Sequence, residues 1–120
     1  MATVDLKSEE FNGVIEKDGI VLVDFWAAWC GPCKSFGPIF EAASEKYPDI
    51  TFAKVDTDAE QEISAAAGIS SIPTLMIFRD GILLFSQPGA LPGPALEDLI
   101  SQVTALDMDQ VRKEISADLT

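Results

Sequence analysis

The stretch VDFWAAWCGPCKSF, from Val23 to Phe36, contains both cysteines and both tryptophans of the chain, together with one aspartate in an apolar run. The residues from Ile20 to Ala27 are nearly all apolar and rich in β-branched and aromatic types, which is typical of a strand buried on both faces. From Gly31 onward, apolar residues recur at helical spacing. The two cysteines therefore stand where a strand is expected to end and a helix to begin.

The cysteines, Cys30 and Cys33, are one helical turn apart at this expected helix start. There, unpaired backbone N–H groups and the positive end of the helix dipole favour a thiolate at Cys30. Gly31 allows a tight turn, and Pro32 costs nothing in the first helical turn because its missing N–H has no partner there. A nucleophilic thiol with a second thiol beside it is what thiol–disulfide exchange requires. We expect Cys33 to be the more buried of the two.

Three other roles for the cysteine pair stay open on the residues alone. A structural disulfide would close a very short loop and constrain the unfolded chain by only about 2 kcal/mol. A zinc site needs four ligands, whereas the chain has two Cys and no His, so a metal could only be shared between two subunits. A pair of inert core thiols fits poorly with the flanking Gly, Pro and Lys34, which favour a surface loop. We therefore expect redox chemistry and no metal.

The charge of the chain restricts its partners. Eight basic residues against twenty acidic ones give a formal net charge of −12. Nucleic acid and anionic membrane surfaces should repel such a chain, so neither is an expected partner, and no apolar run reaches the length of a membrane span. The N-terminal segment lacks the pattern of a signal peptide. We expect a cytoplasmic protein, in a compartment where cysteine pairs are catalytic or metal-binding.

The pattern on both sides of the opening stretch predicts alternating strands and helices. Short runs of apolar, β-branched and aromatic residues predict further strands at Ile50–Val55, Thr74–Phe78 and Ile82–Ser86. Candidate helix caps or breaks stand at Ser8, Asp58 with Gln61, Pro92 to Pro94 and Asp107 with Gln110, and Pro38 should kink the helix that starts at Gly31. The Asp-Gly pair at 80–81 predicts a hairpin turn. A βαβ half followed by a ββα half implies one mixed sheet with helices on both faces.

Five motifs in order resemble the thioredoxin family. WCGPCK at 29–34 matches the family's active-site motif letter for letter, and LVDFWA, IPT, F-x-x-G and GAL fall in the family's order. The resemblance covers residues 4 to about 103 and implies a thioredoxin fold, an α/β single domain with a central mixed sheet. We expect this domain over residues 1–106 and a C-terminal helical extension, with an apolar stripe ending at Leu119, over residues 107–120.

The resemblance also implies an activity, that of a protein disulfide reductase. Cys30 would attack the target disulfide, Cys33 would resolve the mixed disulfide, and the Ile72–Pro73 peptide bond would be cis. The surface that contacts the target would consist of Trp29, Gly31, Pro32, Ile72, Pro73, Gly89 and Ala90. No cofactor would be bound, since electrons would come from NADPH through thioredoxin reductase; disulfide-containing proteins would be the targets, and the chain would be a monomer.

Asp24 is the only charged residue in GIVLVDFWAAWC. An ionised carboxylate in such a strand is costly unless it is paired, and Lys54 on the expected neighbouring strand could pair with it. Alternatively, burial raises the Asp24 pKa and the carboxyl relays a proton for Cys33. The resemblance favours this relay with Lys54 tuning it, and both roles can hold together. Trp26 is expected to be a packing residue.

Two other functions compete with the reductase. One is a binding subunit of a larger complex that uses the fold as a scaffold, with incidental redox activity. The other is an oxidase or isomerase of disulfides, against which the Gly-Pro pair between the cysteines argues. Pro88, where related chains commonly carry a β-branched residue, could also alter the shape of the contact surface.

Overall fold

The computed structural model describes residues 2–118. Within these residues, five strands form one sheet in the order β1-β3-β2-β4-β5. The strands are β1 (Thr3–Asp5), β2 (Ile20–Trp26), β3 (Thr51–Asp56), β4 (Thr74–Arg79) and β5 (Ile82–Pro88). The helices are α1 (Ser8–Ile15), α2 (Gly31–Lys46), α3 (Gln61–Ala66), α4 (Gly93–Ala105) and α5 (Met108–Asp118). Pro38 lies inside α2, which continues past it as expected.

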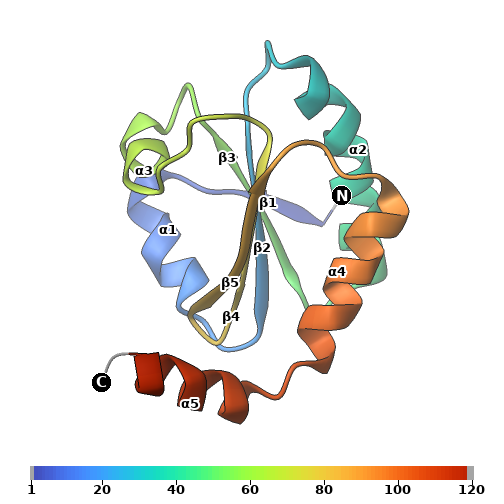
Figure 1. The fold of residues 1–120 in the computed structure, drawn as a ribbon. Coiled ribbons are helices and arrows are strands. Elements are labelled where there is room, and N and C mark those ends of the chain that lie inside the picture. Colours follow the sequence, from blue (N-terminus) through green and yellow to red (C-terminus); the bar gives the residue numbers. More distant parts are fainter. Residues whose placement is uncertain (1, 119–120) are drawn as a thin grey trace.

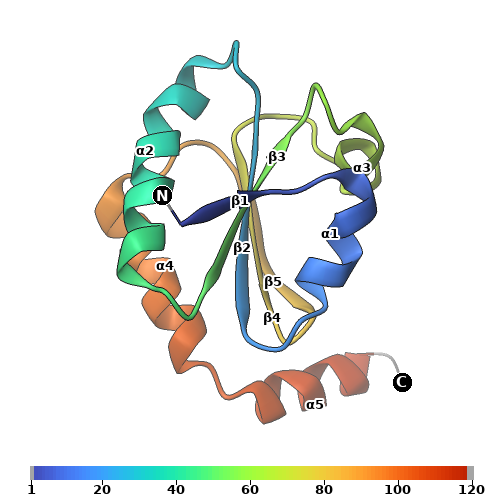
Figure 2. The ribbon, with the colours of Figure 1, turned by 180° about the vertical axis from the view of Figure 1, so that it is seen from behind.

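The sheet is mixed, as the sequence predicts. β1 and β2 both run parallel to β3, β4 runs antiparallel to β2, and β5 runs antiparallel to β4. Helices α1 and α3 cover one face and α2 and α4 cover the other (Figures 1 and 2). None of the helices described in residues 2–118 is long and apolar enough to cross a membrane.

Side chains of β2 alternate between the two faces of the sheet. Val21, Val23 and Phe25 belong to the core beneath α1 and α3, whereas Leu22 belongs to the core beneath α2 and α4. Asp24 follows Leu22 in the second series and is only 1% exposed. The alternation therefore points the one charged residue of this strand toward α2, the helix that begins with the cysteine motif.

Two of the expected helix caps are wrong. Lys7, not Ser8, is the N-cap residue of α1, and the Ser8 N–H instead donates to Glu60 Oε1 at 2.8 Å. Helix α3 begins after Glu60 rather than after Asp58, whose carboxylate accepts from Trp29 Nε1 at 2.9 Å. Both residues make contacts with segments distant in sequence, and a local capping pattern contains no information about such contacts.

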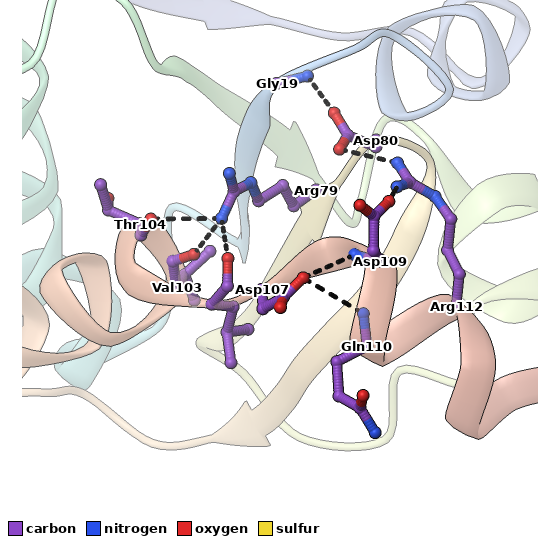
Figure 3. Close-up of polar contacts among 10 residues, drawn as sticks. Gly19, Arg79, Asp80, Val103, Thr104, Asp107, Asp109, Gln110 and Arg112 are labelled. Carbon is purple, nitrogen blue, oxygen red and sulfur yellow. Dashed lines mark hydrogen bonds and ion pairs between the residues drawn. The ribbon is translucent and has the colours of Figure 1, made fainter.

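The β4–β5 hairpin turns at Asp80 and Gly81, which have φ angles of 53° and 80°. These positive angles are what an Asp-Gly hairpin turn requires. Just before the turn, Arg79 Nη1 donates to three carbonyl oxygens at the end of α4 (Figure 3). The acceptors are Val103 O at 2.7 Å, Thr104 O at 3.2 Å and Leu106 O at 3.1 Å.

Helix α5 lies at the same end of the molecule as this hairpin (Figure 1). Asp107 Oδ1 accepts from the N–H groups of Asp109 at 3.0 Å and Gln110 at 3.2 Å, so the expected cap is present. Met108 is buried, whereas Ile115 is 38% exposed. Within the described residues, the apolar stripe is thus best covered at its start. Leu119, its expected last member, lies outside the described residues.

Candidate active site

Cys30 and Cys33 are joined by a disulfide, with their Cα atoms 5.2 Å apart. Cys30 is the N-cap residue of α2, and the Cys33 N–H donates to Cys30 Sγ at 3.2 Å. An N–H group and the positive end of a helix dipole both stabilise a negative sulfur. When the pair is reduced, this arrangement favours the thiolate at Cys30.

Both cysteine residues are almost fully buried, so the expectation that Cys33 is the more buried of the two is wrong. Cys30 is 4% exposed and Cys33 is 6% exposed. They form a small cluster with Ala27, against which Trp26 and Ile72 pack. Since burial does not distinguish the two cysteines, the hydrogen bond at the helix start is the feature that separates their chemistry.

The loop before β4 faces the cysteines. The Ile72–Pro73 peptide bond is cis, as the resemblance implied, and Cys30 Sγ lies 3.6 Å from the Ile72 carbonyl oxygen. The Gly89 N–H donates to Pro73 O at 2.8 Å, which ties the loop after β5 to this one. Gly89 has a φ of 109°, a conformation that favours glycine. The structure thereby brings Gly89 and its exposed neighbour Ala90 next to the loop that faces Cys30.

Trp29 lies beside the cysteines, in the turn before α2. Its side chain is 69% exposed, while its Nε1 donates to Asp58 Oδ2 at 2.9 Å. Gly31 and Pro32 are exposed as well, whereas Pro73 is buried. An exposed aromatic side chain held in place by a hydrogen bond suits the surface to contact with another protein.

Asp24 lies behind Cys33, and the two residues line one cavity of about 280 Å³. Burial raises the pKa of the Asp24 carboxyl to about 7, and the positive charge of Lys54 acts in the opposite direction. Asp24 Oδ1 has no hydrogen-bond partner within the described residues. The cavity has room for several water molecules.

Lys54 stands directly opposite Asp24 in the β2–β3 register. Its ammonium group, however, lies 3.8 Å from Glu41 Oε1 and 5.0 Å from the centroid of the Trp26 ring. Glu41 is not among the site residues that the sequence predicts. Its position eight residues after Cys33 in α2 is the signal that could have found it, because that spacing returns to the same face of a helix.

Comparisons with known proteins agree on one family. The thioredoxin family model matches residues 2–103. The putative thioredoxin 2 of Streptomyces coelicolor is 55% identical, over 96% of this chain and 86% of that protein. The thioredoxin of Bacillus subtilis is 37% identical, over 85% of this chain and 98% of that protein.

A solved structure gives the same result for the fold. The thioredoxin of Malassezia sympodialis superposes with a TM-score of 0.76 at 36% identity, covering 83% of this chain and 89% of that one. The predicted thioredoxin fold is therefore confirmed, and with it the disulfide chemistry of the Cys30–Cys33 pair. The chain belongs to the thioredoxin family and is a thiol–disulfide oxidoreductase.

Proposed function

We propose that the protein is a general reductase of protein disulfides, with Cys30 as nucleophile and Cys33 as resolving thiol. The observation that carries this assignment is the Cys33 N–H at 3.2 Å from Cys30 Sγ, at the start of α2. The Cys30 thiolate attacks one sulfur of the target disulfide and releases the other as a thiolate. Cys33 then attacks Cys30 Sγ, which releases the second target sulfur. Two electrons pass to the target, and the Cys30–Cys33 disulfide remains.

Asp24 is the proposed proton acceptor for the second step. Cys33 must lose its proton before it attacks, and Asp24 shares its cavity. A carboxyl with a pKa of about 7 is about half ionised at neutral pH, which suits a general base at that pH. In this proposal Lys54 tunes the carboxyl by its charge.

The proposed target surface surrounds the sulfurs. Trp29, Gly31 and Pro32 form one side, and Ile72, Pro73, Gly89 and Ala90 form the other. An extended target segment would pair its backbone with Ile72 by strand addition. Such pairing depends on the backbone of the target rather than on its side chains. This supports a broad range of disulfide-containing target proteins.

The electron supply is proposed from the family alone. Thioredoxin reductase would return the disulfide to the dithiol with electrons from NADPH, and the chain itself would bind no cofactor or metal. We further propose a cytoplasmic monomer in which residues 1–106 form the redox domain and residues 107–120 an extension of it.

The test is a trapping experiment with a disulfide target such as insulin. Wild-type protein with NADPH and thioredoxin reductase should reduce insulin, and Cys33→Ser should accumulate a mixed disulfide through Cys30. Cys30→Ser is the matched control and should trap nothing. Equal trapping through Cys33 would reverse the assigned roles. If Cys30→Ser/Cys33→Ser bound its partners as the wild type does and insulin were not reduced, the scaffold function would replace this proposal.

A further inference from the structure

Lys54 forms its ion pair with Glu41 and not with Asp24, which lies opposite it on the neighbouring strand. Lys54 and Asp24 are register partners on adjacent strands, so both side chains project from the same face of the sheet. A lysine side chain there could reach the carboxylate. Within residues 2–118, however, the carboxylate within 4.0 Å of Lys54 Nζ belongs to Glu41, at 3.8 Å.

The charged and titratable groups around Asp24 come from two of the elements packed against it. Lys54 projects from β3, and α2 contributes Cys33, Lys34 and Glu41; all four line the same cavity as Asp24. On the other side, its β4 register partner is the apolar Leu75.

Exposure orders these groups from the inside of the cavity to its mouth. Asp24 is 1% exposed, while the side chains of Lys54 and Glu41 are 17% and 29% exposed. Glu41 therefore holds the ammonium group from its solvent side. The Trp26 ring, 5.0 Å from the ammonium nitrogen, gives the cation a second favourable contact in the same place.

We propose that Glu41 is a positioning residue of the proton relay, which keeps the Lys54 ammonium group at the mouth of the cavity and out of contact with Asp24. This inference rests on the proposed function, since it concerns the proton that Cys33 releases. That proton passes to the Asp24 carboxylate as Cys33 Sγ bonds to Cys30 Sγ, and it later leaves to solvent. Glu41 itself takes up no proton in this sequence.

The placement matters because an ammonium group in direct contact with a carboxylate lowers its pKa and makes it a weaker base. With Lys54 held by Glu41, burial dominates and the Asp24 pKa stays near 7. Released from Glu41, Lys54 would turn inward to Asp24. The carboxyl would then be ionised at lower pH, but it would accept the Cys33 proton less readily.

The experiment follows Asp24 directly, by the ¹³C NMR shift of its carboxyl carbon against pH in the reduced protein. Glu41→Gln should move the titration midpoint to lower pH by roughly half a unit or more. Glu45→Gln, one turn further along α2 and not part of the cavity lining, is the matched control and should leave the midpoint in place. The rate at which preformed mixed disulfide is resolved at pH 8 should fall on the order of twofold for Glu41→Gln alone, because a weaker general base accepts the Cys33 proton less readily.

The same substitution in a Lys54→Met protein distinguishes the positioning role of Glu41 from a direct effect of its charge on Asp24. Lys54→Met should raise the midpoint, because the opposing positive charge is gone. Adding Glu41→Gln to Lys54→Met should then change almost nothing. If the same downward shift persisted without Lys54, or if Glu41→Gln matched the wild type, the inference would be overturned. Insulin reduction by the wild type would stand in either case, so the two proposals fail separately.

Discussion

Asp24 and Trp26 each bury one polar atom near Cys30 and Cys33, at what we call the redox end of the molecule. Asp24 Oδ1 and Trp26 Nε1 have no hydrogen-bond partner within the described residues. Opposite this redox end, at the other end of β2 and β4, lies the hairpin end, formed by Gly19, Arg79, Asp80, Arg112 and the carbonyl end of α4 (Figure 3). There Asp80 accepts from the Gly19 N–H at 2.8 Å and pairs with Arg112 at 3.1 Å, while Arg79 bonds three carbonyls.

The contrast shows that the two ends of one sheet differ in role. Polar contacts stabilise the fold at the hairpin end, whereas the reactive cysteines lie at the redox end. A buried polar atom without a partner costs about 1–3 kcal/mol. At the hairpin end that cost is avoided, and the polar groups fasten β4, α4 and α5 together. At the redox end the cost remains. A fully hydrogen-bonded Asp24 carboxylate would have a low pKa, which would not suit the proton uptake that we propose for it.

The largest expected effect is that of Asp24→Asn on stability. The folded pKa of about 7 lies above the ordinary value of 3.8, so ionisation costs the wild type stability as the pH rises from about 4 to about 7 and levels off above that. The variant carries no such cost. Its advantage in unfolding free energy should therefore grow by about 4 kcal/mol between pH 4 and pH 8. Denaturant melts at several pH values measure it, and resolution of mixed disulfides should slow.

Asp80→Asn makes the same chemical change at the hairpin end and should have the opposite sign. It weakens an exposed ion pair with Arg112, so we expect a loss of about 0.5 kcal/mol or less.

One outcome would contradict the prediction for Asp24→Asn. If this variant were destabilising at pH 8 and mixed disulfides were resolved as in the wild type, Asp24 would be a structural partner of Lys54 and the relay would be wrong.

The sequence predicts features within a short segment better than contacts between distant segments, for a physical reason. Cys30, Cys33 and the helix start lie within a few residues of one another, so local rules apply to them. The contact from Arg79 to α4 joins residues 24 to 27 positions apart. The sequence predicts Asp58 as a local cap, but Asp58 instead holds Trp29, 29 residues away. Glu41 is not predicted, because the role that we propose for it depends on Lys54, which lies on another element.

Arg79→Met tests the hairpin end at its best-connected residue. The variant keeps the apolar part of the side chain but leaves three carbonyls of the α4 end without their charged donor. We expect a loss of about 2 kcal/mol in unfolding free energy, because hydrogen bonds to charged groups contribute more than neutral ones. Insulin reduction should be unchanged. Wild-type stability in this variant would show that water replaces the guanidinium without cost.

Removal of residues 107–120 is expected to have a smaller effect. The cut leaves Leu106 in place, so Arg79 keeps its three acceptors, and the main loss is the burial of Met108, about 1.5 kcal/mol. Reductase turnover should stay within about threefold, which is roughly 0.65 kcal/mol in barrier. A decrease of more than tenfold in a folded truncated protein would place the extension at the redox end in solution.

The smallest expected effect, equal in size to that of Asp80→Asn, is that of Arg112→Met, the same substitution as Arg79→Met at the same end of the molecule. Arg112 pairs with Asp80 and with Asp109, but its side chain is 49% exposed. Exposed pairs contribute about 0.5 kcal/mol or less, because water screens them and the side chains lose freedom in forming them. Lys113→Met is the control for loss of charge from α5. The small difference in unfolding free energy between Arg112→Met and Lys113→Met should vanish at about 1 M salt, where the Debye length is about 3 Å.

A loss as large as that of Arg79→Met would contradict this prediction. It would mean that ion pairs, and not Met108, hold α5 in place. The contact of Arg79 with the three carbonyls of α4 would then no longer be the main attachment of the hairpin end.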